Sequence, residues 1–455
     1  MTSGWDSSLR SGQGMQQSAL CTPLALDKRF SSLFFYKTLT RIKYWHPRLV
    51  HIFRAHRCAE FIFDLGQIEM KNQNTFAILA VLICSITLQV AAQGVGKANP
   101  SAGAGNVIVH PQFGGTIFGF DIDPRGGVGL LTEGEGQPDG SVIAAVETFD
   151  PATGKILRVV AQTQTQDDFV TLAITGNSAG IVEREHVVSL FNVKRTYNLV
   201  NTKTGNMFKG PWTPPIDQSH VINEVSRAYA SPNVAVYALD TSTNFTPLIF
   251  GSNVSANTFG TPFPVLDEDF NFEQSPVIAY DNMKNRAVLG HQKLSQFIVP
   301  PMVGIMDLTT GTFTKFPGLG LGVINGIAVD PQDGIACTTT SFDSSVQFYS
   351  LTSKKGINVP VPGDPQNSLF AGQHIVYDSL NRLFLVAQPF SSTTATGSSI
   401  LVYDTAGNFV ESVDGLSFNG ESNVLPVHIA INPSLRSGFV DGPATDDSEI
   451  QSFTY

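Results

Sequence analysis

Two histidines have the residue type and the spacing for chemistry. His374 and His428 each open an apolar strand that leads into an Asx turn, in "HIVYDSLNR" and "HIAINPSLR", so they occupy equivalent places in two units of a repeat. An imidazole can bind a metal or carry a proton near neutral pH. If the repeats surround a channel, both rings face it, and we predict that His374 and His428 are the candidate catalytic residues.

Further polar residues fall in the loops that enter the equivalent strands, or in the first part of those strands. A carboxylate beside two imidazoles offers oxygen and nitrogen ligands to a divalent cation such as Ca²⁺, although the sequence requires no cofactor and assigns no metal ligand. The alternative is that these residues line a wide channel and hold water. The candidates for ligand binding are Asp168, Glu224, Arg227, Glu273, Asn325 and Gln373.

The elements that position these residues belong to a repeat of roughly 50 residues, a period typical of solenoids and propellers. An apolar strand, a turn of Asx, Pro and Gly residues and a second strand recur seven times, as in "GIAVDPQDGIACTTT". Asp or Asn at the first turn position can bond its own backbone two residues on, and Gly or Asn accepts positive φ before the second strand. The turns begin at Asp123, Gly176, Ser231, Asp281, Asp330, Asp378 and Asn432.

A second hairpin signal follows in five of the seven units, as in "IMDLTTGTFTKF", which indicates four short antiparallel strands per unit. The seventh unit has room for three strands only, and "NVIVHP" (106–111) can supply the fourth and so remove an open edge. We therefore predict an all-β fold, a β-propeller of seven four-stranded blades over residues 106–455. The third unit is poorly marked around "IFGSNVSANTFGTPF", so six or eight blades are the alternatives.

An export signal lies inside the chain. Residues 70–92 contain a charged start, "MK", an apolar run and the small residues "VAA", which is typical of a cleaved signal peptide. We interpret residues 1–69 as an upstream extension before the true start, or a disordered basic segment, with a basic tail on an anchored protein as the alternative. Residues 93–105 are expected to form a flexible leader, and the mature chain to be secreted or periplasmic, without stable membrane insertion.

The composition of the chain limits the classes of partner that it can be expected to bind. The chain has a formal net charge of −10, which argues against nucleic acid and anionic membrane surfaces. Cys337 is the one cysteine after the signal, so no disulfide within the mature chain is expected, and we interpret it as an inert core thiol. The expected partner is a small molecule, a glycan or a protein, and the expected state is a monomer.

The strand-turn-strand pattern resembles a known group. "GIAVDPQDGIACTTT", "IMDLTTGT" and "VYDTAGN" are similar to the NHL, YVTN and lactonase-like propellers of secreted bacterial proteins, over residues 106–455. The resemblance is carried by residues that build blades, so it implies the fold and leaves the activity open. Gluconolactonase-like members carry an acidic ligand in an E-G-P context. The nearest match, Glu133–Glu135 in "LTEGEG", lacks the proline and is expected to follow the second strand.

Two classes of function remain. The first is a secreted binding or scaffold module that recognises its partner at the channel mouth. The second is a lactonase-like or lyase-like enzyme with a divalent cation in the channel, in which His374 or His428 matches the channel base of streptogramin-lyase-like propellers by position alone. The sequence contains no G-x-S-x-G, no H-E-x-x-H and no metal-spaced cysteine pair, which favours the binding module.

Overall fold

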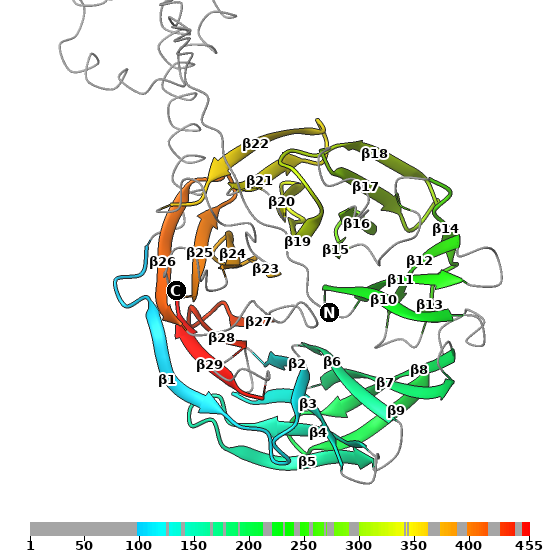
Figure 1. Ribbon diagram of the computed structural model, residues 1–455, viewed down its shortest axis with the longest axis vertical. Coiled ribbons are helices and arrows are strands. Elements are labelled where there is room, and N and C mark those ends of the chain that lie inside the picture. The colour runs from blue at the N-terminus through cyan, green and yellow to red at the C-terminus, as the bar shows by residue number, and fades with distance from the viewer. Residues whose placement is uncertain are drawn as a thin grey trace, which may run out of the picture. The chain divides into compact units, whose positions relative to one another are not determined.

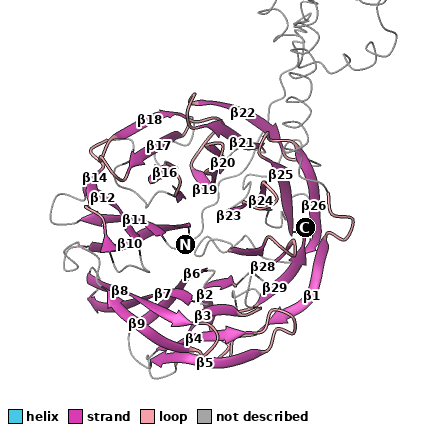
Figure 2. Cartoon of the chain, turned by 180° about the vertical axis from the view of Figure 1, so that it is seen from behind, coloured by secondary structure: helices cyan, strands magenta, loops and turns pink. Residues whose placement is uncertain are grey.

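The computed structural model contains strands, turns and loops over its described part, and no long helix (Figures 1 and 2). The upstream segment 1–69 and the predicted signal segment 70–92 lie outside the described residues. The structure describes residues 98–455, with gaps at 124–126, 138–141, 164–166, 176–178, 190–191, 213–220, 231–232, 241–245, 254–257, 268–269, 271–276, 291–299, 341–342, 344, 363–373, 389–397, 417–427 and 442–447.

The described strands pair into seven antiparallel sheets. The first two sheets are β2 (Thr116–Ile122), β3 (Gly129–Gly136), β4 (Val142–Phe149) and β5 (Ile156–Thr163), then β6 (Asp167–Thr175), β7 (Ala179–Ser189), β8 (Asn192–Asn201) and β9 (Asn206–Trp212). The third and fourth are β10 (Val221–Ala230), β11 (Asn233–Asp240), β12 (Thr246–Asn253), β13 (Thr258–Phe259) and β14 (Phe263–Pro264), then β15 (Val277–Asp281), β16 (Arg286–Gly290), β17 (Met302–Asp307) and β18 (Phe313–Pro317). The fifth and sixth are β19 (Ile324–Asp330), β20 (Ile335–Thr340), β21 (Ser345–Ser350) and β22 (Lys355–Pro360), then β23 (His374–Asp378), β24 (Leu383–Gln388), β25 (Ser398–Asp404) and β26 (Phe409–Leu416). The seventh combines β27 (Ile429–Asn432), β28 (Ser437–Asp441) and β29 (Ile450–Thr454) with β1 (Gly103–Val109).

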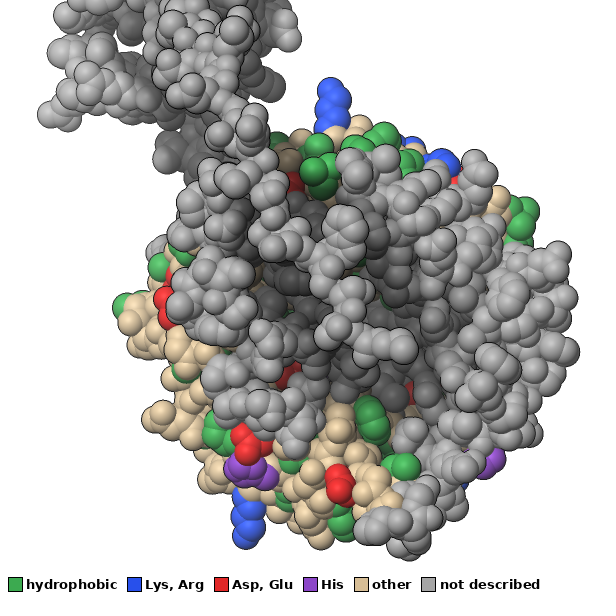
Figure 3. All heavy atoms as spheres, viewed as in Figure 1, with side chains coloured by type: hydrophobic (Ala, Val, Ile, Leu, Met, Phe, Trp, Pro, Cys, Tyr) green, Lys and Arg blue, Asp and Glu red, His purple; other side chains and the backbone are tan. Residues whose placement is uncertain are grey.

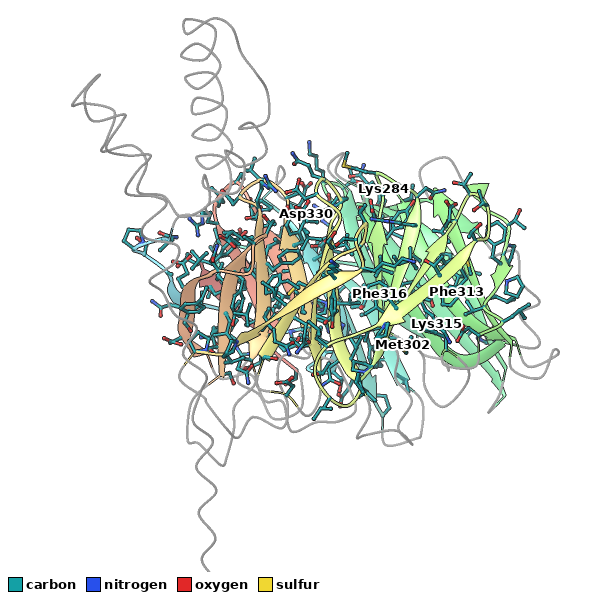
Figure 4. The ribbon with its side chains drawn as sticks, turned by 90° about the horizontal axis from the view of Figure 1, so that it is seen from above. Lys284, Met302, Phe313, Lys315, Phe316 and Asp330 are labelled. Carbon is teal, nitrogen blue, oxygen red and sulfur yellow. The ribbon has the colours of Figure 1, made fainter. Side chains whose placement is uncertain are left out.

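The first strand of each of the first six sheets, and β27 of the seventh, lies toward the centre of a ring, whereas β1 lies at its outside (Figure 1). Each of these inner strands contacts the inner strand on either side, in the order β2, β6, β10, β15, β19, β23 and β27, and β27 contacts β2 again. Viewed from the side, the ring has Lys284 and Asp330 at one face and Met302 toward the other (Figure 4). The predicted all-β propeller is confirmed.

The N-terminal strand belongs to the last sheet. β1 pairs antiparallel with β29, with Gly103 opposite Thr454 and Val109 opposite Ile450. The strand begins at Gly103 rather than at residue 106, and Asn99 already donates from its side chain to the Tyr455 carbonyl at 2.9 Å. The predicted boundary of the flexible leader is therefore wrong for its described part, because Gly-Ala-Gly has little β-propensity of its own and is ordered by its partner strand.

The turns between the first two strands of a sheet follow the predicted chemistry. The side chain of Asp330 accepts the Gln332 N–H at 2.9 Å, and that of Asp378 accepts the Leu380 N–H at 2.9 Å. Five of these turns begin with Asp or Asn. In each of them the residue four positions later has positive φ, namely Gly127, Asn285, Gly334, Arg382 and Arg436. Two of these residues are arginines, for which a left-handed backbone costs ~1–2 kcal/mol.

The side chains of both arginines make contacts outside their own turn. Arg382 forms ion pairs with Asp330 and Asp333 of the preceding sheet. Arg436 bonds Glu411 at 2.8 Å, and its guanidinium lies 5.5 Å from the centre of the Tyr455 ring. The ion pairs of Arg382 and Arg436 with acids of the preceding sheet offset the local backbone strain, and they explain why glycine is replaced at these turns.

The third sheet is irregular where the sequence is poorly marked. Its outer strand is split into β13 and β14, which both pair with β12. Pro262 cannot donate a backbone hydrogen bond, and Gly260 instead donates to the Gly251 carbonyl at 2.7 Å. The break therefore follows from the residues between the two short strands.

The hydrophobic core is divided into layers between neighbouring sheets. Leu385 and Val402 of the sixth sheet pack with Val440 and Phe453 of the seventh. Leu131 and Phe149 of the first sheet pack with Ile450 of the seventh in the same way. The sheets thus bury apolar side chains against their neighbours.

Within the described residues no helix is long and apolar enough to cross a bilayer.

Candidate functional site

The predicted site residues fall on the inner strands. His374 is the first residue of β23, His428 directly precedes β27, and Asn325 lies in β19. Asp168 lies in β6, and both Glu224 and Arg227 lie in β10, where the structure describes the backbone and not the side chains. The two remaining candidates, Gln373 and Glu273, lie outside the described residues.

The two histidines are neighbours, as their equivalent places in the repeat predict. Their ring centroids are 5.7 Å apart, with an angle of 65° between the ring planes. Both residues are partly buried. The rings are therefore close enough for a shared ligand, so their protonation decides what they can do.

His374 accepts a hydrogen bond from the backbone of the next sheet. Its Nδ1 atom lies 3.1 Å from the Ile429 nitrogen, which carries a hydrogen and can only donate. A neutral imidazole has one N–H and one lone pair, so Nδ1 supplies the lone pair and Nε2 carries the hydrogen. This tautomer presents a donor to its surroundings at Nε2, whereas a metal ligand or a general base needs a lone pair there.

The same bond has a structural purpose. β27 is the innermost strand of its sheet, so one of its edges has no partner strand. The Ile429 N–H lies on this free edge, and a buried backbone donor without an acceptor is costly. His374 thus caps an edge of the neighbouring sheet, a role for which its position in the repeat gave no signal.

His428 is held through its backbone. Its N–H donates to Asp441 Oδ2 at 2.6 Å, and its carbonyl accepts the Asp441 N–H at 3.3 Å. The ring also meets the edge of Phe120, with centroids 6.2 Å apart, across the contact between the seventh and first sheets. His428 therefore lies between β23 and β2, with its ring against two others.

Both imidazoles are neutral at ordinary pH. Burial, with a smaller contribution from His428, lowers the pKa of His374 from 6.5 to about 3. Burial lowers the pKa of His428 to about 4. The pair thus contributes hydrogen bonding and apolar ring surface at the inner strands β23 and β27, and no positive charge.

Asn325 lies on a β-bulge of its inner strand. Ile324 pairs with Thr340 and Gly326 with Thr339, so Asn325 is the extra residue of β19. A bulge turns a side chain away from the regular alternation and is frequent beside functional sites. Asn325 is partly exposed and offers both a donor and an acceptor.

A metal centre finds no support among the described side chains. Within that part of the chain no three His, Cys, Asp or Glu side chains are placed to hold one ion. The Nδ1 lone pair of His374 is also already engaged.

Two buried glutamates were not among the predicted site residues. Glu133 of "LTEGEG" lies within β3 rather than after the second strand, so that expectation is wrong. It is fully buried, and so is Glu147 on β4. Acidic residues inside the apolar strands "GLLTEGEG" and "VIAAVETF" were the available signal, because a carboxylate is rarely buried without partners.

Comparison with known proteins adds little to these observations. No family model matches the chain, and no curated protein does. A chain of the solved structure "Crystal Structure of Mitotic Checkpoint Complex" is similar over 80% of this chain and 93% of its own length, with 10% identity and a TM-score of 0.47. The class of the protein, a β-propeller, accordingly follows from its own strand pairing and ring contacts.

Proposed function

We propose that this chain is an exported β-propeller that binds an uncharged small molecule, a glycan or a component of the cell envelope at the mouth of its channel. The observation that carries the proposal is the tautomer of His374, since its lone pair is given to the Ile429 N–H and its Nε2 hydrogen is left to donate. β19 contacts β23, so in this proposal the bulged Asn325 and the two neutral rings together supply hydrogen-bonding groups and ring faces to the ligand. Such a surface suits sugar hydroxyls and amides.

Charge supports the same class of ligand. Charged residues make up 15% of the chain, and on the face in Figure 3 the described charged side chains are scattered rather than gathered into a patch. Recognition of nucleic acid needs a basic patch, and the net charge is −10. Export is inferred from the signal-like segment 70–92, and a monomer is the proposed state.

The test combines binding with metal content. The purified full chain is applied to an array of neutral and acidic glycans and envelope fragments, and its divalent metals are measured by elemental analysis. We expect binding to neutral glycans and no stoichiometric metal. Arg227→Ala and Asn325→Ala should each weaken binding at least tenfold, whereas Lys355→Ala, on the exposed outer strand β22, should not change it.

Other outcomes decide against the proposal. A stoichiometric divalent metal that is lost in His374→Ala, together with hydrolysis of lactones, would establish the lactonase-like alternative. Glycan binding that Lys355→Ala weakens and Asn325→Ala leaves unchanged would move the site from the channel to the outer rim.

A further inference from the structure

Two buried glutamates lie where the last sheet passes into the first. Glu133 on β3 and Glu147 on β4 have no solvent exposure. Glu133 pairs with Ala145 and Leu131 pairs with Glu147, so both carboxyl groups are on the side of the sheet that carries Leu131. Leu131 packs against the seventh sheet, which places the two acids in the contact that closes the ring.

A short segment crosses over these carboxyl groups. Residues 110–115 connect β1 of the seventh sheet to β2 of the first. The N–H groups of Phe113 and Gly115 donate to the two oxygens of Glu133 at 3.1 and 2.9 Å, and that of Gln112 donates to Glu147 Oε2 at 3.0 Å. The segment also presses on β3, because a Cβ on Gly115 would lie 2.5 Å from the Gly134 carbonyl oxygen.

One carboxyl oxygen has no donor. Glu147 Oε1 is buried and receives no hydrogen bond, while the neighbouring carboxyl group is that of Glu133. Two ionised carboxylates can only accept, but a hydrogen on Glu147 would let it donate to Glu133. Burial raises the pKa of Glu147 to about 8, with the Gln112 N–H opposing the rise and Glu133 adding to it.

The other titratable groups near residues 110–115 are Glu135, His110 and Asp441. Glu135 is two residues further along β3 on the same side and is partly exposed. His110, at the start of the segment, pairs with Glu449 at 2.9 Å, and Asp441 on β28 accepts the His428 N–H. The charged group that acts on Glu147 is Glu133, and the strands of the seventh sheet contribute Val109, Phe439 and Ile450.

We propose that Glu133 and Glu147 share one proton, and that loss of this proton loosens the crossing segment and makes the closure of the ring sensitive to pH. The folded chain keeps the proton to a higher pH than the unfolded chain, in which an ordinary glutamate titrates near 4.5. The stabilisation from the pair is therefore complete below pH 4.5 and declines as pH rises toward 8. Above that pH two buried carboxylates repel each other under the same segment.

The first test is the pH dependence of thermal unfolding in the full chain. Glu147→Gln keeps the shape of the protonated acid, so we expect it to melt at a higher temperature than the wild type at pH 9, and the difference to shrink toward pH 5. Glu135→Gln is the matched control on the same strand and should follow the wild type throughout. A Glu147→Gln variant that melts below the wild type at pH 9, or differs by the same amount at every pH, overturns the proposal.

A second measurement does not depend on whether the variant folds. Infrared spectra of the wild type at pH 6.5 in heavy water should contain the carbonyl band of a protonated carboxylic acid, and this band should disappear toward pH 9. Amide hydrogen exchange of residues 112–115, corrected for intrinsic rates, should accelerate over the same range. A wild type without the band at pH 6.5 refutes the shared proton.

Discussion

Replacing Tyr455 by phenylalanine removes one hydroxyl group from the contact between the last two sheets. The Tyr455 side chain is fully buried, and its hydroxyl donates to Asp378 Oδ2 at 2.8 Å. Asp378 is fully buried as well and keeps its bonds from Leu380 and Asn381 when the hydroxyl is lost. Burial and the neighbouring Asp378 raise the pKa of Tyr455, so the hydroxyl stays a donor at every accessible pH.

The expected loss follows from the charge of the acceptor. A hydrogen bond to a charged group contributes ~1.5–3 kcal/mol, and the phenylalanine ring fills the same space, so no cavity is added. A propeller of about 350 residues unfolds with an entropy of roughly 0.7 kcal/mol/K, from about 2.1 cal/mol/K per residue. The midpoint of thermal unfolding should therefore fall by about 2–4 °C.

Differential scanning calorimetry of the full chain measures this shift, and Tyr403→Phe is the matched control. Tyr403 is also fully buried, but its hydroxyl has no hydrogen-bond partner in the described part of the chain. Its replacement should not lower the midpoint, because it removes a buried hydroxyl that has no partner and costs stability. Equal shifts in the two variants, or no shift in Tyr455→Phe, would refute the assignment of the stabilisation to the Asp378 contact.

Three further predictions concern other contacts. The pKa values of His374 and His428 are lowered to about 3 and 4, so the stability they confer is complete above pH 6.5 and is lost as pH falls through 4. His428→Phe should therefore reduce the change of the thermal midpoint between pH 6.5 and pH 4. An unchanged dependence of the midpoint on pH would count against the buried pair. Arg382→Ala should be less stable in urea than Arg382→Gly by about 1 kcal/mol, because only glycine relieves the φ of 59°, and equal stabilities would contradict the strain. Gly154→Ala should lower the free energy of unfolding by more than about 2 kcal/mol, because φ is 73° and the new Cβ would lie 2.3 Å from the Ile108 carbonyl oxygen. The control Gly136→Ala places its Cβ near no other atom and should change the free energy of unfolding little. Similar values for the two variants would disprove the clash.

Much of the fold can be predicted because each sheet repeats the same local chemistry. An Asx side chain that bonds its own turn, followed by a residue with positive φ, is visible in letters such as "DPQDG". The turns led by Asp150, Asn201, Asp307 and Asp404 work in the same way. Local signals of this kind need no knowledge of distant residues, which is why they are readable in a single sequence.

The features that escaped prediction depend on residues distant in sequence. The strand β1 begins at a Gly-Ala-Gly segment that is ordered by β29, and Arg382 replaces glycine because its side chain reaches the preceding sheet. At the candidate site, the closeness of His374 and His428 was predictable from the repeat, but the Ile429 N–H that fixes the tautomer was not. The buried Glu133 was visible as a residue, and its partners in the crossing segment were not.

The closure of the ring by β1 also has a consequence for synthesis. The bond from Asn99 to the Tyr455 carbonyl joins residues 356 positions apart, so among the described strands β1 is synthesised first and its partner β29 last. At ~5–20 residues per second, the ribosome leaves β1 without that partner for roughly 20–70 s. Gly103, Ala104 and Gly105 are poor strand formers alone, which limits mispairing with a neighbouring nascent chain during this delay.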